Sequence, residues 1–165
     1  MIPQVLVTIV DQNNLILGFK KRGLGQDLFN GFGGHIEEGE YPILAAQREL
    51  SEEAKIDVPV QLLNPVGVLD FEGVAEDSIR VFLFILHLEE TTISDSEFIE
   101  TDEMKPMIVK RTEIPWEKMW PDDPHWLPHI LRGDIVEGKF TFEDGKLIQT
   151  FLKVTGNQKE LFPTK

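Results

Sequence analysis

Alternation of apolar and polar positions divides the chain into several short strands and two helices. β-branched and apolar residues fill positions 5–10 and 15–19, which predicts two strands joined by a polar turn at residues 11–14. Residues 60–71 and 79–88 are also strand-like, and the unbroken apolar run of the second is typical of a strand covered on both faces. Residues 107–109 predict a short strand, and residues 135–142 and 147–152 predict a hairpin around Glu143-Asp144-Gly145.

Two segments follow helical spacing instead. The first opens near Glu40 and Pro42, and its apolar stripe consists of Ile43, Ala46, Leu50 and Ala54. The second covers residues 122–131 and is followed by Gly133. Between the elements we expect a glycine-rich loop over residues 23–34 and an acidic loop over residues 89–103. Strands with two helices predict an α/β sandwich.

Length and composition limit the number of domains. The chain has 165 residues, of which 41% are apolar, which is enough for one core and too little for two ordinary domains. We therefore expect a single domain over residues 1–156 and a loosely ordered tail over residues 157–165. No apolar run approaches the roughly 20 residues that cross a bilayer, and the first residues lack the basic segment of a signal peptide. The expected location is the cytoplasm, and the expected state is a monomer.

Charge and cysteine content narrow the function. The net charge is −13, with 29 acidic and 16 basic residues, and this argues against a nucleic-acid polymer as partner. A small nucleotide remains compatible, because a divalent metal can neutralise carboxylates and phosphates together. The chain has no cysteine, which excludes disulfides, thiol nucleophiles and cysteine-based zinc sites.

The first predicted helix concentrates carboxylates on one face. Glu49, Glu52 and Glu53 stand at i, i+3 and i+4, where like charges repel each other. A solvated helix face is the simpler interpretation of such a group. The alternative is a site for a hard cation, because oxygen ligands of this kind suit Mg²⁺ or Mn²⁺.

The spacing around these carboxylates resembles the Nudix signature. Gly34 is followed after five residues by Glu40 and after seven more by the run Arg48-Glu49-Leu50-Ser51-Glu52-Glu53-Ala54-Lys55-Ile56. The one departure is Lys55, where the family has a glycine; we expect a cost on the order of 1 kcal/mol there, or a helix end shifted by one residue. The resemblance implies the Nudix fold, an α/β/α sandwich with a mixed sheet and a loop–helix–loop. It also implies Mg²⁺-dependent hydrolysis of a nucleoside diphosphate linked to another group.

Three further runs narrow the resemblance to the animal MutT homologues within that family, which hydrolyse oxidised purine nucleoside triphosphates to the monophosphate and pyrophosphate. These runs are residues 29–34, Asp102-Glu103-Met104-Lys105-Pro106 and Met119-Trp120-Pro121-Asp122-Asp123. By resemblance, the metal ligands are Glu49, Glu52, Glu53, Glu103 and the Gly33 carbonyl, and Arg48 orients the carboxylates. The implied purine-binding and pocket residues are Asn30, Phe71, Trp120, Asp122 and Asp123, with Phe32, Gly33, Gly34 and His35 in the adjoining loop and Lys20 toward the phosphates. Val5 is included as a departure, because the relatives have a base-contacting threonine there, and Leu24 and Phe29 replace larger aromatic residues.

Several alternatives stay open from the sequence. Asp123 and Pro124 also fit a helix cap and first helical residue, and Glu53 and Glu103 are both candidates for the general base. The histidines at residues 125 and 129 fit packing better than metal binding. The chain also fits a Nudix hydrolase of unmodified nucleotides or nucleotide sugars, or a Nudix-fold binding module without catalysis.

Overall fold

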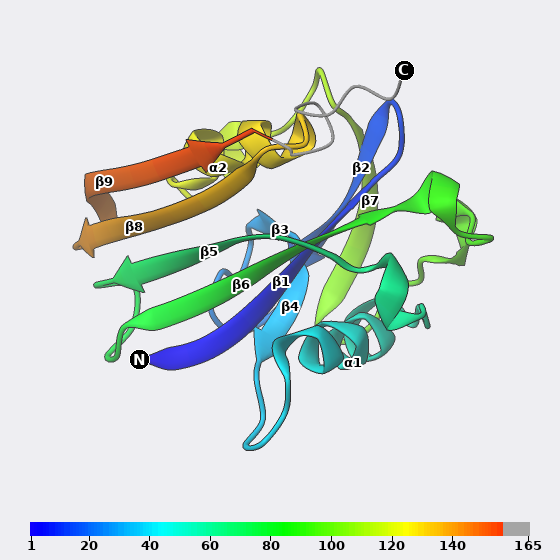
Figure 1. Ribbon diagram of the computed structural model, residues 1–165, viewed down its shortest axis with the longest axis horizontal. Helices are drawn as coiled ribbons and strands as arrows, with labels where there is room; N and C mark the ends of the chain where they lie inside the picture. Colours follow the sequence, from blue (N-terminus) through cyan, green and yellow to red (C-terminus); the bar gives the residue numbers. More distant parts are fainter. Residues whose placement is uncertain (157–165) are drawn as a thin grey trace.

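The computed structural model describes residues 1–156, so the expectation for the tail at 157–165 lies outside the described residues. Within residues 1–156, nine strands form a mixed sheet in the order β3-β2-β1-β6-β5-β8-β9, with β4 paired to β1 and β7 paired to β2 (Figure 1). Their bounds are β1 Ile2–Val10, β2 Asn14–Lys20, β3 Phe29–Asn30, β4 Phe32–His35, β5 Asn64–Glu72, β6 Ile79–His87, β7 Met104–Lys110, β8 Ile135–Glu143 and β9 Lys146–Thr155. The β1–β6 and β5–β8 pairs are parallel and the others are antiparallel.

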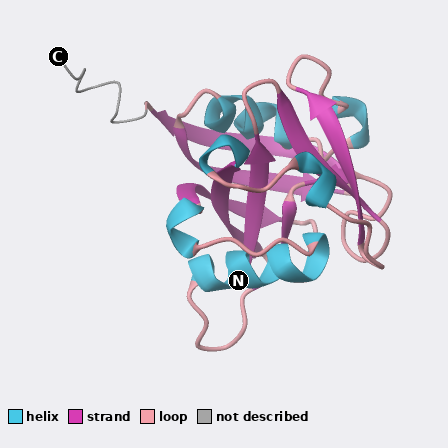
Figure 2. Ribbon diagram, turned by 90° about the vertical axis from the view of Figure 1, so that its right-hand side faces the viewer, coloured by secondary structure: helices cyan, strands magenta, loops and turns pink. Residues whose placement is uncertain are grey.

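In the described part of the chain, two α-helices cover the sheet from opposite sides, α1 Pro42–Ala54 and α2 Asp123–Leu131 (Figure 2). Short 3₁₀ turns occur at Val60–Leu62, Leu88–Glu90, Asp95–Glu97 and Trp116–Lys118. No helix within residues 1–156 is long and apolar enough to span a lipid bilayer. The expected α/β class and mixed sheet between helices are confirmed.

Strand β1 separates two apolar clusters, because successive side chains of a strand point to opposite faces. Val5, Val7 and Ile9 pack with Leu50 of α1. On the other face, Leu6 joins a second cluster that includes residues of α2 and β8. One cluster therefore supports the helix that carries the carboxylates, and the other lies on the opposite side of the strand.

The edge of β1 changes partner along its length. Residues 4–7 pair with β4, where Val7 lies opposite Phe32, whereas Ile9 pairs with Ile16 of β2. Strand β2 then diverges from β1 to pair with β3 and with β7. The strands therefore part near residue 8, and the cavity described below opens on this part of the sheet.

Three sequence expectations needed correction. The predicted loop at residues 23–34 ends in strands β3 and β4, because glycines there allow β4 to approach β1 closely. Residues 60–62 form a 3₁₀ turn, so β5 begins only at Asn64. Strand β7 is longer than expected, since pairing with β2 holds seven residues in place although many of their side chains are exposed.

The structure shows which of the two expected effects of Lys55 occurs at the end of α1. The helix ends at Ala54, and Lys55 takes the left-handed conformation with φ 56° and ψ 33°. The Leu50 carbonyl accepts the Ile56 N–H at 3.3 Å, which closes the helix as a glycine-type cap does. The lysine therefore adopts the glycine conformation and leaves the helix end where the signature puts it.

Candidate active site

Arg48 of α1 forms hydrogen bonds with several carboxylates at one edge of the site. Its guanidinium donates two hydrogen bonds to the Glu40 carboxylate, at 3.0 and 2.9 Å. It also donates to Glu49 at 2.9 Å, to Glu52 at 3.3 Å and to the His35 carbonyl at 2.8 Å. These bonds raise the pKa of Arg48 and lower that of Glu40. Arg48 therefore ties the loop before α1 to the carboxylates of the helix.

Glu53 is the most deeply buried carboxyl of α1. Its side chain accepts the Gly33 N–H at 3.0 Å on Oε2, and Lys20 Nζ lies 3.4 Å from Oε1. Burial raises the pKa of Glu53 to about 7, against the lowering effects of Lys20 and the Gly33 N–H. Burial also raises the pKa of Glu49, although Arg48 opposes this. Burial therefore opposes ionisation of both carboxyls, and for Glu53 it moves the pKa into the neutral range.

Two glycines let the β4 backbone touch both the sheet and these carboxyls. A Cβ on Gly33 would lie 1.9 Å from the Val5 carbonyl oxygen, and one on Gly34 would lie 2.3 Å from Glu49 Oε1. The first separation excludes any side chain, because the Val5 backbone is held in the sheet, whereas the second would require the Glu49 carboxylate to move. Close packing of β4 on β1 therefore requires glycine at position 33, and glycine at position 34 leaves the Glu49 carboxylate where it is.

Glu103 approaches the same region from the residue before β7. Arg22 Nη2 lies 2.8 Å from its Oε1, and this hydrogen bond lowers the pKa of Glu103. The charge of Glu103 in turn contributes to the raised pKa of Glu49. Glu52 differs from the other three, because its side chain is 59% exposed and its contact is with Arg48. Glu49, Glu53 and Glu103 thus form the inner carboxylate group.

The donor chemistry of this group fits a hard divalent cation. It offers carboxylate oxygens whose pKa values are raised in Glu49 and Glu53 by burial and by neighbouring negative charge. Within residues 1–156, no three histidine, aspartate or glutamate side chains stand close enough together to enclose an ion as they are placed. Lys20 and Arg22 instead contact Glu53 and Glu103 and supply the positive charge.

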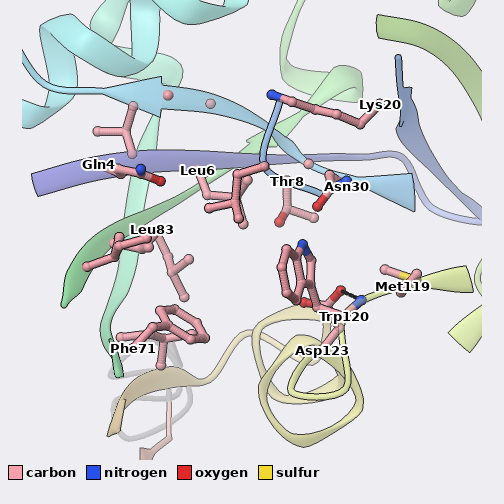
Figure 3. Close-up of a pocket in the computed structure, with 18 of the residues that line it drawn as sticks. Gln4, Leu6, Thr8, Lys20, Asn30, Phe71, Leu83, Met119, Trp120 and Asp123 are labelled. Carbon is pink, nitrogen blue, oxygen red and sulfur yellow. Dashed lines mark hydrogen bonds between the residues drawn. The ribbon is translucent and has the colours of Figure 1, made fainter. Parts of the chain in front are cut away.

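A cavity of about 440 Å³ adjoins the carboxylates, and Figure 3 shows its lining. This volume falls in the range of small-molecule sites. Lys20, Arg22 and Glu103 border it together with the backbone of Gly33 and Gly34, and an apolar part is formed by Leu6, Phe71 and Leu83. The ring of Phe71 stacks on that of Phe140 with centroids 5.5 Å apart. The cavity therefore connects charged residues suited to phosphate with an apolar wall suited to a base.

Asp122 and Asp123 bring two carboxyls into this apolar region beside Trp120. The Trp126 indole N–H donates to Asp122 at 2.9 Å, and the Trp120 backbone N–H donates to Asp123 at 3.1 Å. Burial raises the pKa of Asp122 to about 6. Burial and the charge of Asp122 raise the pKa of Asp123 well above its usual range. Burial and mutual repulsion therefore favour protonation of this pair at a higher pH than that of a free aspartate.

The capping interpretation of Asp123 is not supported by the structure. The cap position of α2 is Asp122, whose side chain makes no capping hydrogen bond, and Asp123 is already helical. The Asp123 carboxyl bonds backward to Trp120, and not to a free N–H of the first helical turn. These two side chains consequently remain on the cavity wall.

Asn30 on β3 presents a fixed amide to the cavity. Its Nδ2 donates to the Leu28 carbonyl at 3.1 Å and to the Gly25 carbonyl at 3.5 Å. These two bonds determine which way the amide faces and leave Oδ1 as an acceptor. Figure 3 shows Asn30 and Trp120 on facing sides of the cavity.

Two other residues that we expected in the substrate site lie at the border of the cavity. Val5 borders the cavity, although its side chain belongs to the cluster beneath α1. His35 also borders the cavity, is exposed and lies 3.3 Å from Gln4 between their Nε2 atoms. For Phe32 the structure corrects the expectation, since its ring is fully buried against Phe98 and does not line the cavity.

Some of the residues that line the cavity belong to none of the sequence motifs. Gln4, Leu6 and Thr8 face the cavity from β1, and Leu83 of β6 adds to its apolar wall. Thr8 left one signal in the sequence, because it is the lone polar residue in the apolar run at positions 5–10. Strand alternation then places it on the same face as Leu6.

Comparison with known proteins agrees with this geometry. The NUDIX domain model matches residues 2–144. The chain is 34% identical over 146 residues to the mouse oxidized purine nucleoside triphosphate hydrolase, covering 88% of this chain and 90% of that protein. It is 36% identical over 143 residues to the zebrafish protein of the same name, covering 87% and 88%.

Solved structures share the fold. The crystal structure of a MutT protein from Bacillus halodurans superposes with a TM-score of 0.75 at 23% identity, covering 92% of this chain and 97% of that one. The dihydroneopterin triphosphate pyrophosphohydrolase of E. coli superposes with a TM-score of 0.54 at 18% identity, covering 76% and 95%. The matched domain and the two vertebrate relatives show that the chain belongs to the Nudix family of hydrolases.

Proposed function

We propose that this protein hydrolyses oxidised purine nucleoside triphosphates to the monophosphate and pyrophosphate and so removes damaged nucleotides from the cellular pool. The observation that carries the proposal is the buried pair Asp122–Asp123 beside Trp120, whose pKa values are both raised, in a cavity that continues to Lys20 and Glu103. The names of the mouse and zebrafish relatives support the same activity. We place it in the cytoplasm, where free nucleotides are found. We also propose that it acts as a monomer, because the residues of the proposed site all come from one chain.

The aspartate pair provides a physical basis for choosing an oxidised base. Guanine has an acceptor at N7, whereas its 8-oxo form carries a proton at N7 and an oxygen acceptor at C8. A protonated carboxyl donates a hydrogen bond and an ionised one accepts, so a pair that shares one proton can do both. Moving the proton between Asp122 and Asp123 would match a different arrangement, such as that of 2-hydroxyadenine. The flat face of Trp120 would stack against either ring.

The charged end of the cavity is suited to the triphosphate. Lys20 is a cation at the boundary between the cavity and Glu53, and it would bind phosphate oxygens. Glu49, Glu53 and Glu103, helped by Glu52 and the Gly33 carbonyl, would hold Mg²⁺, with Mn²⁺ as an alternative. A bound ion of this kind neutralises phosphate charge and lowers the pKa of water.

Glu53 is the candidate we favour for general base. In the metal-free fold its pKa is about 7, so the free carboxyl can take up or release a proton near neutral pH, as a general base must. Its hydrogen bond from Gly33 fixes the carboxyl, and Lys20 can stabilise the charge before the proton arrives. Glu103 is the weaker candidate, because Arg22 holds its pKa below the usual range.

A screen that detects both pyrophosphate and nucleoside monophosphate tests the function, because hydrolysis of ADP-ribose releases AMP and ribose 5-phosphate and no pyrophosphate. Purified protein would be incubated with 8-oxo-dGTP, 2-hydroxy-dATP, O6-methyl-dGTP, dGTP and ADP-ribose, with Mg²⁺, with Mn²⁺ or with EDTA. We expect the highest kcat/KM for an oxidised purine triphosphate, no turnover in EDTA, and loss of turnover in Glu53→Gln. Glu143→Gln, an exposed glutamate on β8, is the matched control.

The screen also separates the alternatives. A preference for dGTP or ADP-ribose would identify a Nudix hydrolase of another nucleotide. Absence of pyrophosphate or monophosphate from every nucleotide, together with measurable binding of one of them, would identify a non-catalytic binding module.

A further inference from the structure

Thr8 is a buried polar residue on the cavity wall that no motif assigns to a role. Its exposed fraction is 4%, and it shares the cavity-facing side of β1 with Leu6. Figure 3 shows its side chain directed into the cavity between Leu6 and Asn30. It is positioned where β1 changes partner, between Val7 paired to β4 and Ile9 paired to β2. The parting of the strands therefore uncovers this side chain to the cavity.

The hydroxyl of Thr8 is not used in hydrogen bonding within the described part of the protein. Within residues 1–156, the Thr8 hydroxyl has no hydrogen-bond partner. Every side-chain polar atom of that range that is sealed from solvent does have such a partner. The Thr8 oxygen must therefore face the open space of the cavity. A hydroxyl in a largely buried position is disfavoured unless it is hydrogen-bonded. A valine would fill the same volume, so the hydroxyl gives the cavity wall a donor and an acceptor that a ligand can use in place of water.

Asn30 provides a neighbouring polar atom on the same side. Its Nδ2 is engaged with the Leu28 and Gly25 carbonyls, so Oδ1 is the atom left for a ligand. Figure 3 shows Thr8 and Asn30 together across the cavity from Trp120, with Asp123 on the side of Trp120. A planar base in the cavity would therefore meet polar groups at two of its edges, the aspartate pair at one and Thr8 with Asn30 at the other.

We propose that Thr8 is a base-contacting specificity residue whose hydroxyl, beside Asn30 Oδ1, hydrogen-bonds the six-membered-ring edge of the purine. This inference rests on the proposed function, in which the aspartate pair takes the imidazole edge. A hydroxyl both donates and accepts, whereas Asn30 Oδ1 only accepts. Thr8 can therefore adjust to an oxo or an amino substituent on that ring, which a fixed amide oxygen alone cannot do.

The test compares Thr8→Val, which removes the hydroxyl at constant shape, with Thr8→Ser, which keeps it. We expect Thr8→Val to lower kcat/KM for 8-oxo-dGTP roughly tenfold, and Thr8→Ser to stay within about threefold. The melting temperature of Thr8→Val should equal or exceed that of the wild type, because no hydrogen bond within the protein is lost. Thr150→Val, an exposed threonine on β9, is the matched control and should change neither quantity.

Substrate analogues identify the contact on the base. The Thr8→Val penalty should vanish with 8-oxo-dITP, which lacks the 2-amino group, or with the 8-oxo-2-aminopurine triphosphate, which lacks the 6-oxo group. A penalty of unchanged size with both analogues, wild-type kcat/KM in Thr8→Val, or a lowered melting temperature that accompanies the loss would each overturn the proposal.

A binding measurement keeps this inference separate from the proposed function. Quenching of tryptophan fluorescence by 8-oxo-dGMP in EDTA reports base binding without turnover. Weaker binding of 8-oxo-dGMP by Thr8→Val supports the contact even if the wild type hydrolyses none of the triphosphates, an outcome that would overturn only the hydrolytic function. Equal binding by wild type and Thr8→Val would overturn the contact alone.

Discussion

Lys20 Nζ lies 3.4 Å from Glu53 Oε1, yet this contact does not keep the glutamate acidic. Burial outweighs the lysine and raises the pKa of Glu53 from 4.5 to about 7. Because the folded state binds this proton more tightly than the unfolded state, the stabilising contribution is complete below pH 4.5 and is lost as the pH rises through about 7. The buried Glu53 carboxylate therefore makes the metal-free fold less stable at neutral pH than at acidic pH.

Glu53→Gln should stabilise the metal-free protein and abolish its activity. The amide has no charge to desolvate, so we expect a gain on the order of 2 kcal/mol in unfolding free energy at pH 8 and little gain at pH 4. Urea denaturation in EDTA at the two pH values measures this. Glu143→Gln should show no such difference between them. A loss of stability at pH 8 would show that the Lys20 contact outweighs burial.

Asp123→Asn should reduce discrimination for the oxidised base. The amide cannot share a proton with Asp122, so the matched donor and acceptor at the imidazole edge are lost. We expect the ratio of kcat/KM for 8-oxo-dGTP to that for dGTP to fall by about tenfold to a hundredfold. Steady-state pyrophosphate release measures both values, and an unchanged ratio would contradict the proton-sharing pair.

The same aspartates predict a pH dependence of stability. The pKa of Asp122 is raised to about 6 and that of Asp123 is raised well above 3.8, so their contribution to stability is lost as the pH rises through these raised values. The melting temperature of the wild type should therefore fall more steeply between pH 5 and pH 8 than that of Asp123→Asn. Asp77→Asn, at an exposed aspartate, should follow the wild type. Parallel curves for wild type and Asp123→Asn would rule out the raised pKa of the pair.

Arg48→Gln should destabilise the fold more than a comparable change elsewhere. Arg48 is largely covered and holds Glu40, Glu49 and the loop carbonyl of His35. We expect a loss of roughly 2–3 kcal/mol in unfolding free energy, because two covered carboxylates lose their partner. Arg80→Gln, which breaks the exposed pair with Asp70, should cost clearly less. Equal losses in urea denaturation would show that Arg48 contributes only a surface ion pair.

Lys55→Gly should stabilise the protein. Lys55 has φ 56°, a conformation that costs a lysine more than a glycine. The expected gain is about 0.5–1 kcal/mol in unfolding free energy. Lys55→Ala separates conformation from charge, since alanine keeps the strain and should give no gain. Equal effects of the two substitutions would assign the change to charge.

Much of the fold was predictable because its elements carry local signals. The stripe of Ile43, Ala46, Leu50 and Ala54 specified α1, and apolar runs specified the central strands. Strands β3 and β4 were missed because they are short and half of their residues are glycine or asparagine, and because the pairing of β4 depends on how closely it approaches β1. That distance is a tertiary property without a local pattern.

The candidate site was predictable to the extent that motifs encode it. Spacing gave the carboxylates of α1, and the run Trp120-Pro121-Asp122-Asp123 gave the aspartate pair. Phe32 was assigned to the cavity because it stands among residues that do line it, but strand alternation turns its ring into the core. Thr8 was overlooked for the opposite reason, since its neighbours in sequence are ordinary core residues.

The two faces of β1 have a consequence for how such a protein can diverge. Residues that support α1 and its carboxylates alternate with residues that line the cavity, so each set can be substituted while the other is retained. A mutation at Leu6 or Thr8 reshapes the cavity wall and leaves the packing of Val5 and Val7 beneath the helix in place. Descendants of this chain can therefore acquire new nucleotide preferences by single substitutions while the hydrolytic machinery is inherited intact.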